Sequence, residues 1–520
     1  MKRWLALVPF LLALILAAQQ TRDARLTVRL LDGAGKPTPA RVRVTDAAGK
    51  PVAVDAKGAV GALFGRSDRA EGYFFHYDGG FYADGSFEMA LAPGRYTVAV
   101  AKGYEYLGQT VQVELLPGKA VRRDVRLARW IDMPSRGWYS ADDHIHVQRS
   151  PRDDPAVLRW IAAEDVHVGN ILEMGDFWAT YFTQHAFGPA GRYREGNFIL
   201  TPGQEEPRTP EIGHTISLGA SELVRFPNDY YDYGRVFDRV HELGGISGFA
   251  HQAMTFHGYR GMVLTALFRK VDFMELAQFC AVEGPIPTDH YYHWLDLGIP
   301  ITALAGSDFP WCGRGARYGV EPGMTRIGDA RFYTYVGQPF TFERWLEAVK
   351  AGRTFATTGP ILELTVNGKL PGERIEAAPG SAVRVVAKAY GHAQQIPLSE
   401  LELVVHGEVV KTAGGSAEQL AIEMDLPVQH GFWVAARAKA DRLQLAHTTP
   451  VYVSVNGSFH NPKTAAKRLA DSEAHLKGLE EALAKPGDRL DEQAPRHRAK
   501  LATRIAEARA ELSALAARLR

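Results

Sequence analysis

Apolar and polar residues alternate in short runs through residues 24–115, and glycine and proline separate the runs. The alternation is clear from Leu26 to Val28 and returns after a Gly/Pro turn. Successive side chains of a strand point to opposite faces, so a period of two indicates strands with one buried face. Residues 24–48 are therefore predicted to form a strand pair, and residues 22–131 an N-terminal β-sandwich of short strands.

The pattern changes between residues 138 and 358, where short apolar runs alternate with amphipathic stretches. Residues 246–250 are one such run, and residues 342–351 are a stretch with the period of a helix. Strands and helices that take turns favour parallel βα units, which form a barrel or an open sheet. In barrels the chemistry takes place at the C-terminal ends of the strands.

The C-terminal third returns to period-two patterning in residues 360–456, which predicts a second β-sandwich. In residues 462–520 leucine and isoleucine recur at spacings of three and four along two stretches, as on the buried stripe of a helix. The Pro-Gly-Asp sequence at residues 486–488 predicts the turn of a C-terminal αα-hairpin. We expect the hairpin to pack on the body of the chain or on a second copy as a homo-oligomer, and its deletion to spare the chemistry.

Residues 1–20 have the form of a signal peptide, with Lys2 and Arg3 before an apolar run that ends at Ala18. The run has about fourteen apolar residues, fewer than the roughly 20 that a membrane-spanning helix needs. We therefore expect an exported protein, periplasmic or secreted, without stable membrane insertion after cleavage. An uncleaved membrane anchor is the alternative.

The two cysteines, Cys280 and Cys312, are too few for the disulfide framework of a small exported domain. They either pair in an oxidising compartment or remain separate buried thiols. Stability must therefore come mainly from burial of apolar surface.

The net charge of the chain is close to zero, at +1. Proteins that bind nucleic acid without sequence preference neutralise phosphates with an excess of basic residues. Nucleic acid is therefore not an expected partner, and we expect a small-molecule substrate.

Histidines are concentrated in the central region, where ten of the eighteen lie between Asp142 and Pro310. His144 and His146 follow the first apolar run of this region. If that run is a strand, the two imidazoles project from the same face, as two ligands of one metal ion do. A His-x-His pair is also common in protein cores, so the prediction depends on further ligands.

Four more side chains with metal-binding atoms lie at or beside the ends of predicted strands: Glu205, His214, His251 and Asp308. Taken singly, each has a structural explanation, as a core histidine, a helix N-cap or a solvated loop charge. The C-terminal strand ends of a barrel meet on one side, so the four are predicted to join the histidine pair. Imidazole and carboxylate ligands suit Zn²⁺, with Mn²⁺ and Fe²⁺ as alternatives.

The order of these motifs resembles that of the PHP (polymerase and histidinol phosphatase) superfamily: His-x-His, Pro-Gly-x-Glu, Gly-His, a strand that ends in histidine, and Gly-Ser-Asp. The chain is most similar to the CehA/McbA-type metallohydrolases, which include ester- and carbamate-cleaving enzymes. Residues 352–360 are similar to the segment that closes their catalytic domain. The resemblance covers residues 138–370 and implies a distorted (βα) PHP-type barrel. Residues 22–131 resemble the carboxypeptidase-regulatory or transthyretin-like modules of exported enzymes.

This resemblance implies one or two divalent ions per chain, with Glu205 bridging a pair of them. The other ligands are then divided between the ions, with His144, His146 and Asp308 on one and His214 and His251 on the other. The implied catalytic residues are Glu205, Asp308 and His251, and Asp308 shuttles the proton. The chain is thus expected to be an exported hydrolase that uses a metal-activated hydroxide to cleave an ester, carbamate or phosphoester bond.

Two departures from the superfamily pattern bear on the number of ions. Where Thr-Asp-His is usual, this chain offers only Glu173 and Asp176 as substitutes. Where Asp-x-His is usual, Pro310 takes the place of the histidine and has no side-chain donor. We therefore expect at most two catalytic ions. An exported binding or scaffold protein with an inactive barrel is the alternative function.

Four weaker candidates complete the set. Arg208 follows Glu205 closely enough to contact an anionic group of a substrate. Glu275 ends an apolar run and either faces the site or is a structural carboxylate. His290 and His293 are expected in surface loops.

Overall fold

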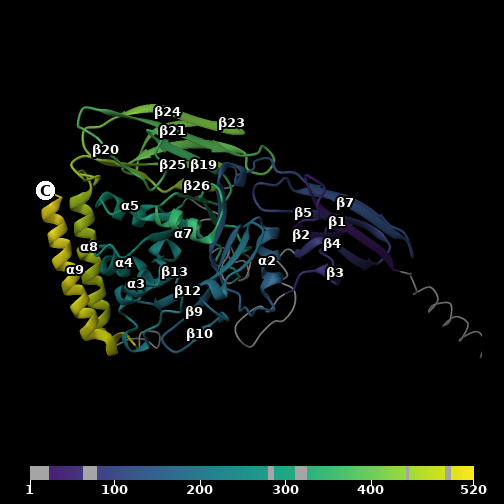
Figure 1. The fold of residues 1–520 in the computed structure, drawn as a ribbon, viewed down its shortest axis with the longest axis horizontal. Helices are drawn as coiled ribbons and strands as arrows, with labels where there is room; N and C mark the ends of the chain where they lie inside the picture. The colour runs from purple at the N-terminus through teal and green to yellow at the C-terminus, as the bar shows by residue number, and fades with distance from the viewer. Residues whose placement is uncertain are drawn as a thin grey trace, which may run out of the picture. The chain divides into compact units, whose positions relative to one another are not determined.

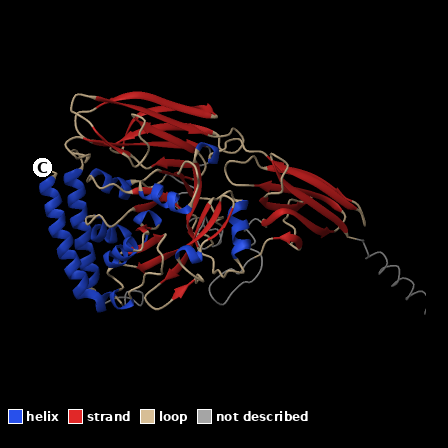
Figure 2. Cartoon of the chain, viewed as in Figure 1, coloured by secondary structure: helices blue, strands red, loops and turns tan. Residues whose placement is uncertain are grey.

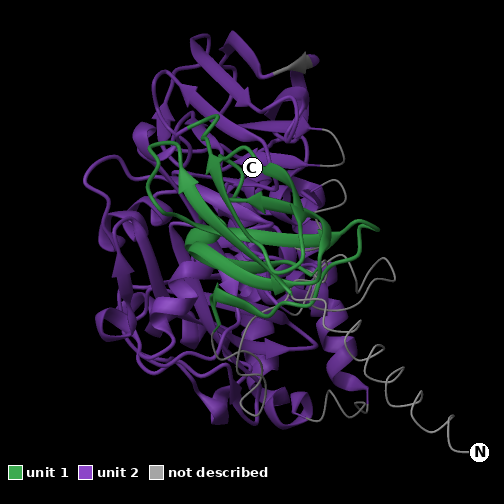
Figure 3. Ribbon diagram, turned by 90° about the vertical axis from the view of Figure 1, so that its right-hand side faces the viewer, with its two compact units in different colours: residues 1–62, 72–131, 162–165 green, residues 63–71, 132–161, 166–520 purple. Residues whose placement is uncertain are grey.

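The computed structural model describes residues 23–61, 79–278, 286–310, 325–440, 444–485 and 493–519 (Figure 1). The chain forms two compact units, of which the first comprises residues 1–62, 72–131 and 162–165 and the second the remainder (Figure 3). Strands are abundant in both units, and the two longest helices belong to the second (Figure 2). The predicted signal peptide, both cysteines and the predicted hairpin turn lie outside the described residues.

The first unit is a seven-stranded sheet in which β6, β5, β2, β4, β1 and β7 pair in that order and β3 pairs with β4. Its strands are β1 (Ala24–Asp32), β2 (Pro39–Asp46), β3 (Ala56–Ala59), β4 (Phe81–Leu91), β5 (Gly94–Ala101), β6 (Gln109–Leu115) and β7 (Ala120–Leu127). The predicted alternation is present: Leu26 and Val28 are buried, and Arg25 and Arg29 are exposed. One apolar core joins all seven strands.

The predicted pairing within residues 24–48 is wrong. β1 and β2 are bridged only beside their turn, at Leu31 and Pro37, and β4 lies between them along the sheet. Alternation reports which face of a strand is buried but not which strand lies next to it.

The second unit contains a closed barrel. Seven strands form its ring in this order: β8 (Trp138–Ile145), β9 (Val168–Gly175), β12 (Phe198–Thr209), β13 (Gly213–Leu218), β14 (Ile246–Phe249), β15 (Phe273–Ala277) and β16 (Thr302–Ala305). A parallel bridge between Ile145 and Phe309 closes the ring. β13 is antiparallel to both of its neighbours, whereas the other ring pairs are parallel.

Ring strands such as β8 and β9 are buried at every residue, as expected of a sheet covered on both faces. The helices between the strands are α2 (Asp154–Ala163), α3 (Tyr233–Glu242), α4 (Gly258–Ala266) and α5 (Asp289–Asp296). The short strands β10 (Thr180–Tyr181) and β11 (Tyr193–Glu195) extend the sheet at β9 and β12. The predicted alternation of apolar runs with helical stretches is therefore present.

Beyond the ring, β17 (Arg331–Tyr335) pairs with β8, and α7 (Phe342–Lys350) leads to β18 (Thr354–Thr357). The C-terminal β region has two layers. One layer contains β19 (Ile361–Val366), β21 (Ala382–Tyr390) and β24 (Gln419–Pro427). The other contains β20 (Arg374–Glu376), β22 (Leu398–Val405), β23 (Glu408–Ala417), β25 (Phe432–Ala440), β26 (Leu445–Thr448) and β27 (Val451–Ser454). β26 also pairs with β18, so this layer continues into the strands that follow the ring.

The C-terminal hairpin consists of α8 (Ala465–Ala484) and α9 (Arg498–Arg518). The two helices lie side by side against α4 (Figure 1). Their apolar stripes, which include Leu479 and Ile505, are buried in the same core as the barrel helices. Within the described residues, no helix combines the length and the apolar character needed to cross a membrane.

Candidate metal centre

Strand β8 carries His144 into the interior of the second unit, and His146 follows the last residue of the strand; both side chains are buried. The preceding Asp142 fixes this strand end. One of its oxygens accepts hydrogen bonds from the backbone N–H groups of His144 and Ser307, each at 3.0 Å, and the other from that of Gly328 at 2.7 Å. The two imidazoles therefore project from a strand end that is tied to its neighbours.

Four donor atoms from distant parts of the sequence meet at this point. The Nε2 atoms of His144 and His146 lie 3.1 Å apart. Oε2 of Glu205 lies 3.8 and 3.4 Å from them, and Oδ1 of Asp308 lies 3.4 Å from each. Bonds of ~2.0–2.1 Å to a tetrahedral zinc ion place neighbouring donor atoms roughly 3.3–3.4 Å apart. The donor atoms of His144, His146 and Asp308 thus form one group with the spacing of ligands around one ion.

Hydrogen bonds at the far side of each ring orient the lone pairs. His146 Nδ1 lies 3.3 Å from the carbonyl oxygen of Leu172, which can only accept a hydrogen bond. His144 Nδ1 lies 3.0 Å from a carboxylate oxygen of Glu275. When either ring is neutral, as a metal ligand must be, its proton is therefore on Nδ1, and Nε2 presents its lone pair to the other donors.

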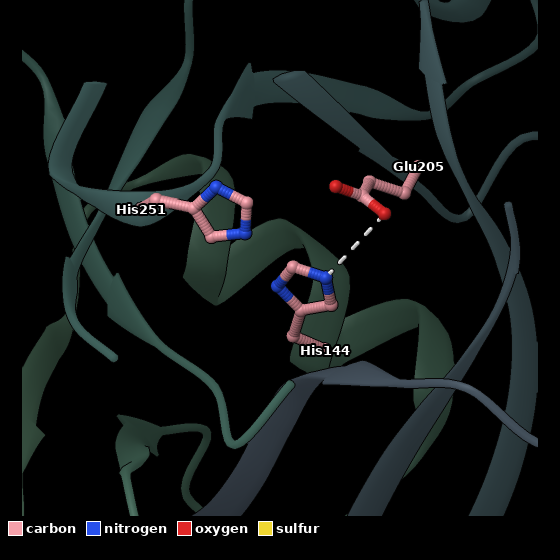
Figure 4. A group of neighbouring side chains, drawn as sticks. All are labelled: His144, Glu205 and His251. Atoms are coloured by element: carbon pink, nitrogen blue, oxygen red, sulfur yellow. Dashed lines mark ion pairs between the residues drawn. The ribbon is translucent and has the colours of Figure 1, made fainter. Parts of the chain in front are cut away.

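His251 forms a second donor group with His144 and Glu205. Figure 4 shows these three side chains converging from different elements, with the Glu205 carboxylate directed toward His144. His251 Nε2 lies 3.4 Å from Oδ2 of Asp308, and its Nδ1 lies 2.8 Å from the hydroxyl of Thr255. Buried histidine, glutamate and aspartate side chains thus form groups that could hold a metal ion.

The carboxylates of the cluster are anionic. Burial alone would raise the pKa of Glu205, but the Arg208 guanidinium and the nearby imidazoles lower it well below its usual range. The pKa of Asp308 is likewise lowered against the effect of burial, chiefly by His144. Burial opposes protonation of His144, yet Asp308 and Glu275 raise its pKa well above the ordinary value. The cluster therefore attracts positive charge, which a dication supplies in place of protons.

His214 lies beside the cluster but belongs to neither donor group found among the described residues. Its Nδ1 is 2.9 Å from Oε1 of Glu205 and 3.4 Å from Nε of Arg208. Burial and the Arg208 charge lower the pKa of His214 to about 3, so its ring is neutral. Its role as a metal ligand stays a prediction.

Glu173 and Asp176, the two carboxylates considered as further ligands, are engaged with the loop that follows β9. Glu173 accepts a hydrogen bond from the backbone N–H of Gln184 at 3.0 Å. Asp176 accepts bonds from the backbone N–H groups of Trp178 and Ala179, at 2.8 and 2.9 Å. Neither carboxylate joins a donor group in the part of the chain that the structure describes.

Glu275 is the residue whose role sequence reasoning left open. It is fully buried on β15, and its two oxygens accept from His144 Nδ1 at 3.0 Å and from the backbone N–H of His251 at 2.6 Å. It therefore holds two candidate ligands in place. In the sequence, the sign of this role was a carboxylate within an otherwise apolar run.

His290 and His293 lie on helix α5, so the loop prediction is wrong. His293 Nε2 is 2.8 Å from the hydroxyl of Ser472 on α8, and His290 stacks on Tyr259. Both contribute to helix packing rather than to the donor groups.

The loop after β14 has an unusual backbone. Residues with positive φ are His251, Gln252, Ala253, Phe256 and His257. Such conformations cost about 1–3 kcal/mol each in residues other than glycine, and they cluster at functional sites. The segment that carries His251 is thus held in a strained shape beside the donor groups.

No family model matches the chain, and no curated protein matches it. Among solved structures, the fibronectin(III)-like modules of Clostridium thermocellum CbhA are 18% identical with a TM-score of 0.14, over 18% of this chain and 96% of theirs. The Bacillus anthracis TIE protein is 6% identical with a TM-score of 0.13, over 84% of this chain and 51% of its own. A Listeria innocua β-glucosidase is 9% identical with a TM-score of 0.14, over 65% and 40% of the two chains. Likenesses this weak assign no function.

Proposed function

We propose that this protein is an exported metal-dependent hydrolase of the PHP superfamily, similar to the CehA/McbA-type enzymes. The observation that carries the proposal is the donor group of His144, His146 and Asp308, whose atoms lie 3.1–3.4 Å apart, with an oxygen of Glu205 3.4–3.8 Å from the two imidazoles. The motif order and the ring of seven strands support the same assignment. Export rests on the sequence of residues 1–20.

Zinc fits the donor set best. Two imidazole nitrogens and one carboxylate oxygen at these spacings, with water at the open position, match a four-coordinate catalytic site, and Mn²⁺ or Fe²⁺ accept similar ligands. The second group, formed by His144, Glu205 and His251, shares His144 with the first, so the described donors support one ion or a close pair.

The bound ion would lower the pKa of water and polarise the oxygen of the bond to be cleaved, as catalytic dications do. The chain's own residues supply the rest. Glu275 and the Leu172 carbonyl hold the two imidazoles with Nε2 toward the site. Gln278 donates to Oδ2 of Asp308 at 2.9 Å, which orients this carboxylate. Oδ2 also faces His251, so Asp308 is placed to take the proton of the attacking water and pass it to the leaving group.

A binding or scaffold protein with an inactive barrel is the second candidate. The observation that favours it is the loss of two superfamily histidines, at the stretch of Glu173 to Asp176 and at Pro310. An inactive barrel of this kind has no need of buried donor groups with the spacing of metal ligands, which favours the hydrolase.

Purified full-length protein separates the two candidates. Elemental analysis is expected to find one or two equivalents of zinc, manganese or iron, and p-nitrophenyl acetate or p-nitrophenyl phosphate is expected to be cleaved. The variant His146→Ala should lose metal and turnover, whereas the matched variant His430→Ala, in the C-terminal β region, should keep both. Metal-free wild-type protein that cleaves neither substrate after reconstitution would favour the scaffold.

A further inference from the structure

A break in the ladder between β12 and β13 brings Arg208 to the metal centre. Residues three apart in a regular strand point to opposite faces. The pairing register shifts between Glu205 and Arg208, and Arg208 lies directly opposite His214. As a result, Arg208 Nε lies 3.3 Å from Oε2 of Glu205 and 3.4 Å from Nδ1 of His214. Bulges often occur beside active sites, where they re-aim a side chain.

Most of the Arg208 guanidinium is available to a ligand. Its Nε faces the cluster, whereas its two terminal nitrogens donate no hydrogen bond to any residue that the structure describes. The side chain is 21% exposed. A guanidinium presents its N–H donors as a planar fork that matches the paired oxygens of a carboxylate or a phosphate.

Apolar surface lies next to this fork. Phe256 stacks on the ring of His214, with centroids 4.2 Å apart and planes inclined by 10°. Phe256 is 50% exposed, and the nearby Met254 is 39% exposed. Both belong to the strained loop that carries His251. An oxyanion on the fork would therefore have a surface nearby on which its carbon skeleton can pack.

We infer that Arg208 is a specificity-determining residue and that the substrate carries a carboxylate or phosphoryl oxyanion at or beside the bond that is cleaved. This inference rests on the proposed hydrolase function. Arg208 contacts Oε2 of Glu205, a proposed ligand atom, so an oxyanion on the fork lies within a few bonds of the reacting carbon or phosphorus. An arginine that only offset the charge of Glu205 would leave the choice of substrate unchanged.

The test compares three p-nitrophenyl substrates with full-length, zinc-loaded protein. The butyrate ester is neutral, the succinate half-ester replaces its terminal methyl group with a carboxylate, and the phosphate monoester carries the oxyanion on the group that is cleaved. Arg208→Gln is expected to lower kcat/KM for an anionic substrate by about 10- to 100-fold more than for the butyrate ester, mainly through KM. Arg208→Lys, which keeps the charge without the fork, should recover part of the loss. Whichever anionic substrate is affected shows where the oxyanion lies relative to the bond that is cleaved.

A binding measurement provides a readout apart from turnover. Calorimetric titration with succinate and with inorganic phosphate should show at least one of them bound about 10-fold more weakly by Arg208→Gln than by the wild type, at equal zinc content. Arg239→Gln, the same change at an exposed arginine of α3 that pairs with Glu222, is the matched control.

Two outcomes overturn the inference while the hydrolase proposal stands: equal losses on charged and neutral substrates, or unchanged binding of both anions by Arg208→Gln. If zinc-loaded wild-type protein cleaves none of the three substrates, the hydrolase proposal fails. The anion titration then still decides whether Arg208 binds an oxyanion.

Discussion

Replacing Glu275 with glutamine keeps the shape of a fully buried side chain but removes one of its two strong acceptors. In the native protein one oxygen accepts from His144 Nδ1 at 3.0 Å and the other from the His251 backbone N–H at 2.6 Å. A glutamine amide has one oxygen and one NH₂ group, so either orientation sets a donor against a donor. Whichever bond is lost, one candidate ligand is no longer held.

The magnitude follows from that unsatisfied donor. A buried N–H without a partner costs about 1–3 kcal/mol, which corresponds to about 5- to 150-fold in an equilibrium constant. If the unpaired donor is His144 Nδ1, zinc affinity should decrease within this range. Losses of about 10- to 100-fold are typical when a residue that holds a metal ligand is replaced. Stability is a less direct readout because Glu275 also faces the buried Asp143, whose pKa is raised by burial and by the Glu275 charge. Removing that charge relieves repulsion and offsets part of the destabilisation.

Zinc affinity of full-length protein is measured by competition with a chromophoric chelator, for the wild type and for Glu275→Gln. The matched control is Glu402→Gln, which changes a buried carboxylate on β22 that pairs with Arg437. We expect the control to bind zinc as the wild type does. Wild-type affinity in Glu275→Gln, with the protein folded, would refute the role of Glu275 as the residue that holds His144 and His251.

Three further results are expected. His144→Ala and His146→Ala should each lose bound metal and turnover with an unchanged circular dichroism spectrum, and full activity in both would remove the site assignment. Leu479→Ala should lower the free energy of unfolding by about 2–5 kcal/mol, because this side chain is fully buried. Deletion of residues 462–520 should therefore give unstable protein rather than spare the chemistry, and a truncated protein with wild-type thermal stability would contradict this. Arg504 and Lys500 lower the pKa of Asp232, although burial opposes this shift. Their contribution to stability is therefore fully present above the unfolded pKa of about 3.9 and is lost as the pH falls through the lower folded pKa. Arg504→Ala should thus lower the melting temperature at pH 6 more than in strong acid, and an equal effect at both pH values would count against the ion pair.

Most of the candidate ligands could be predicted from the sequence because the patterns that indicate them are local. His144 lies at the end of β8 and His146 directly after it, and their Nε2 atoms lie 3.1 Å apart. Glu205, His251 and Asp308 follow or end apolar runs; His251 and Asp308 lie just after β14 and β16, whereas Glu205, which was expected at a strand end, lies within β12. His214 has the same local signal, yet its ring lies next to the donor groups rather than within them.

Other features depend on contacts that no local pattern reports. Glu275 is an isolated carboxylate in an apolar run, and only the pairing of β14 with β15 places it behind His144 and His251. The bulge that turns Arg208 toward Glu205 depends on the register between two strands. In the same way, β4 separates β1 from β2, and the stripe on α8 and α9 packs on the barrel helices.

The sequence by itself thus indicated the main strand and helix segments, though not helix α5, as well as which faces are buried and which side chains carry metal-binding atoms. These properties depend on the period of the local backbone and on residue chemistry. Tertiary structure alone decided which strands are neighbours, what lies behind each ligand and where Arg208 points. Those outcomes are set by pairing and packing between segments far apart in the chain, and a shift of one residue in register moves every side chain of a strand to the other face.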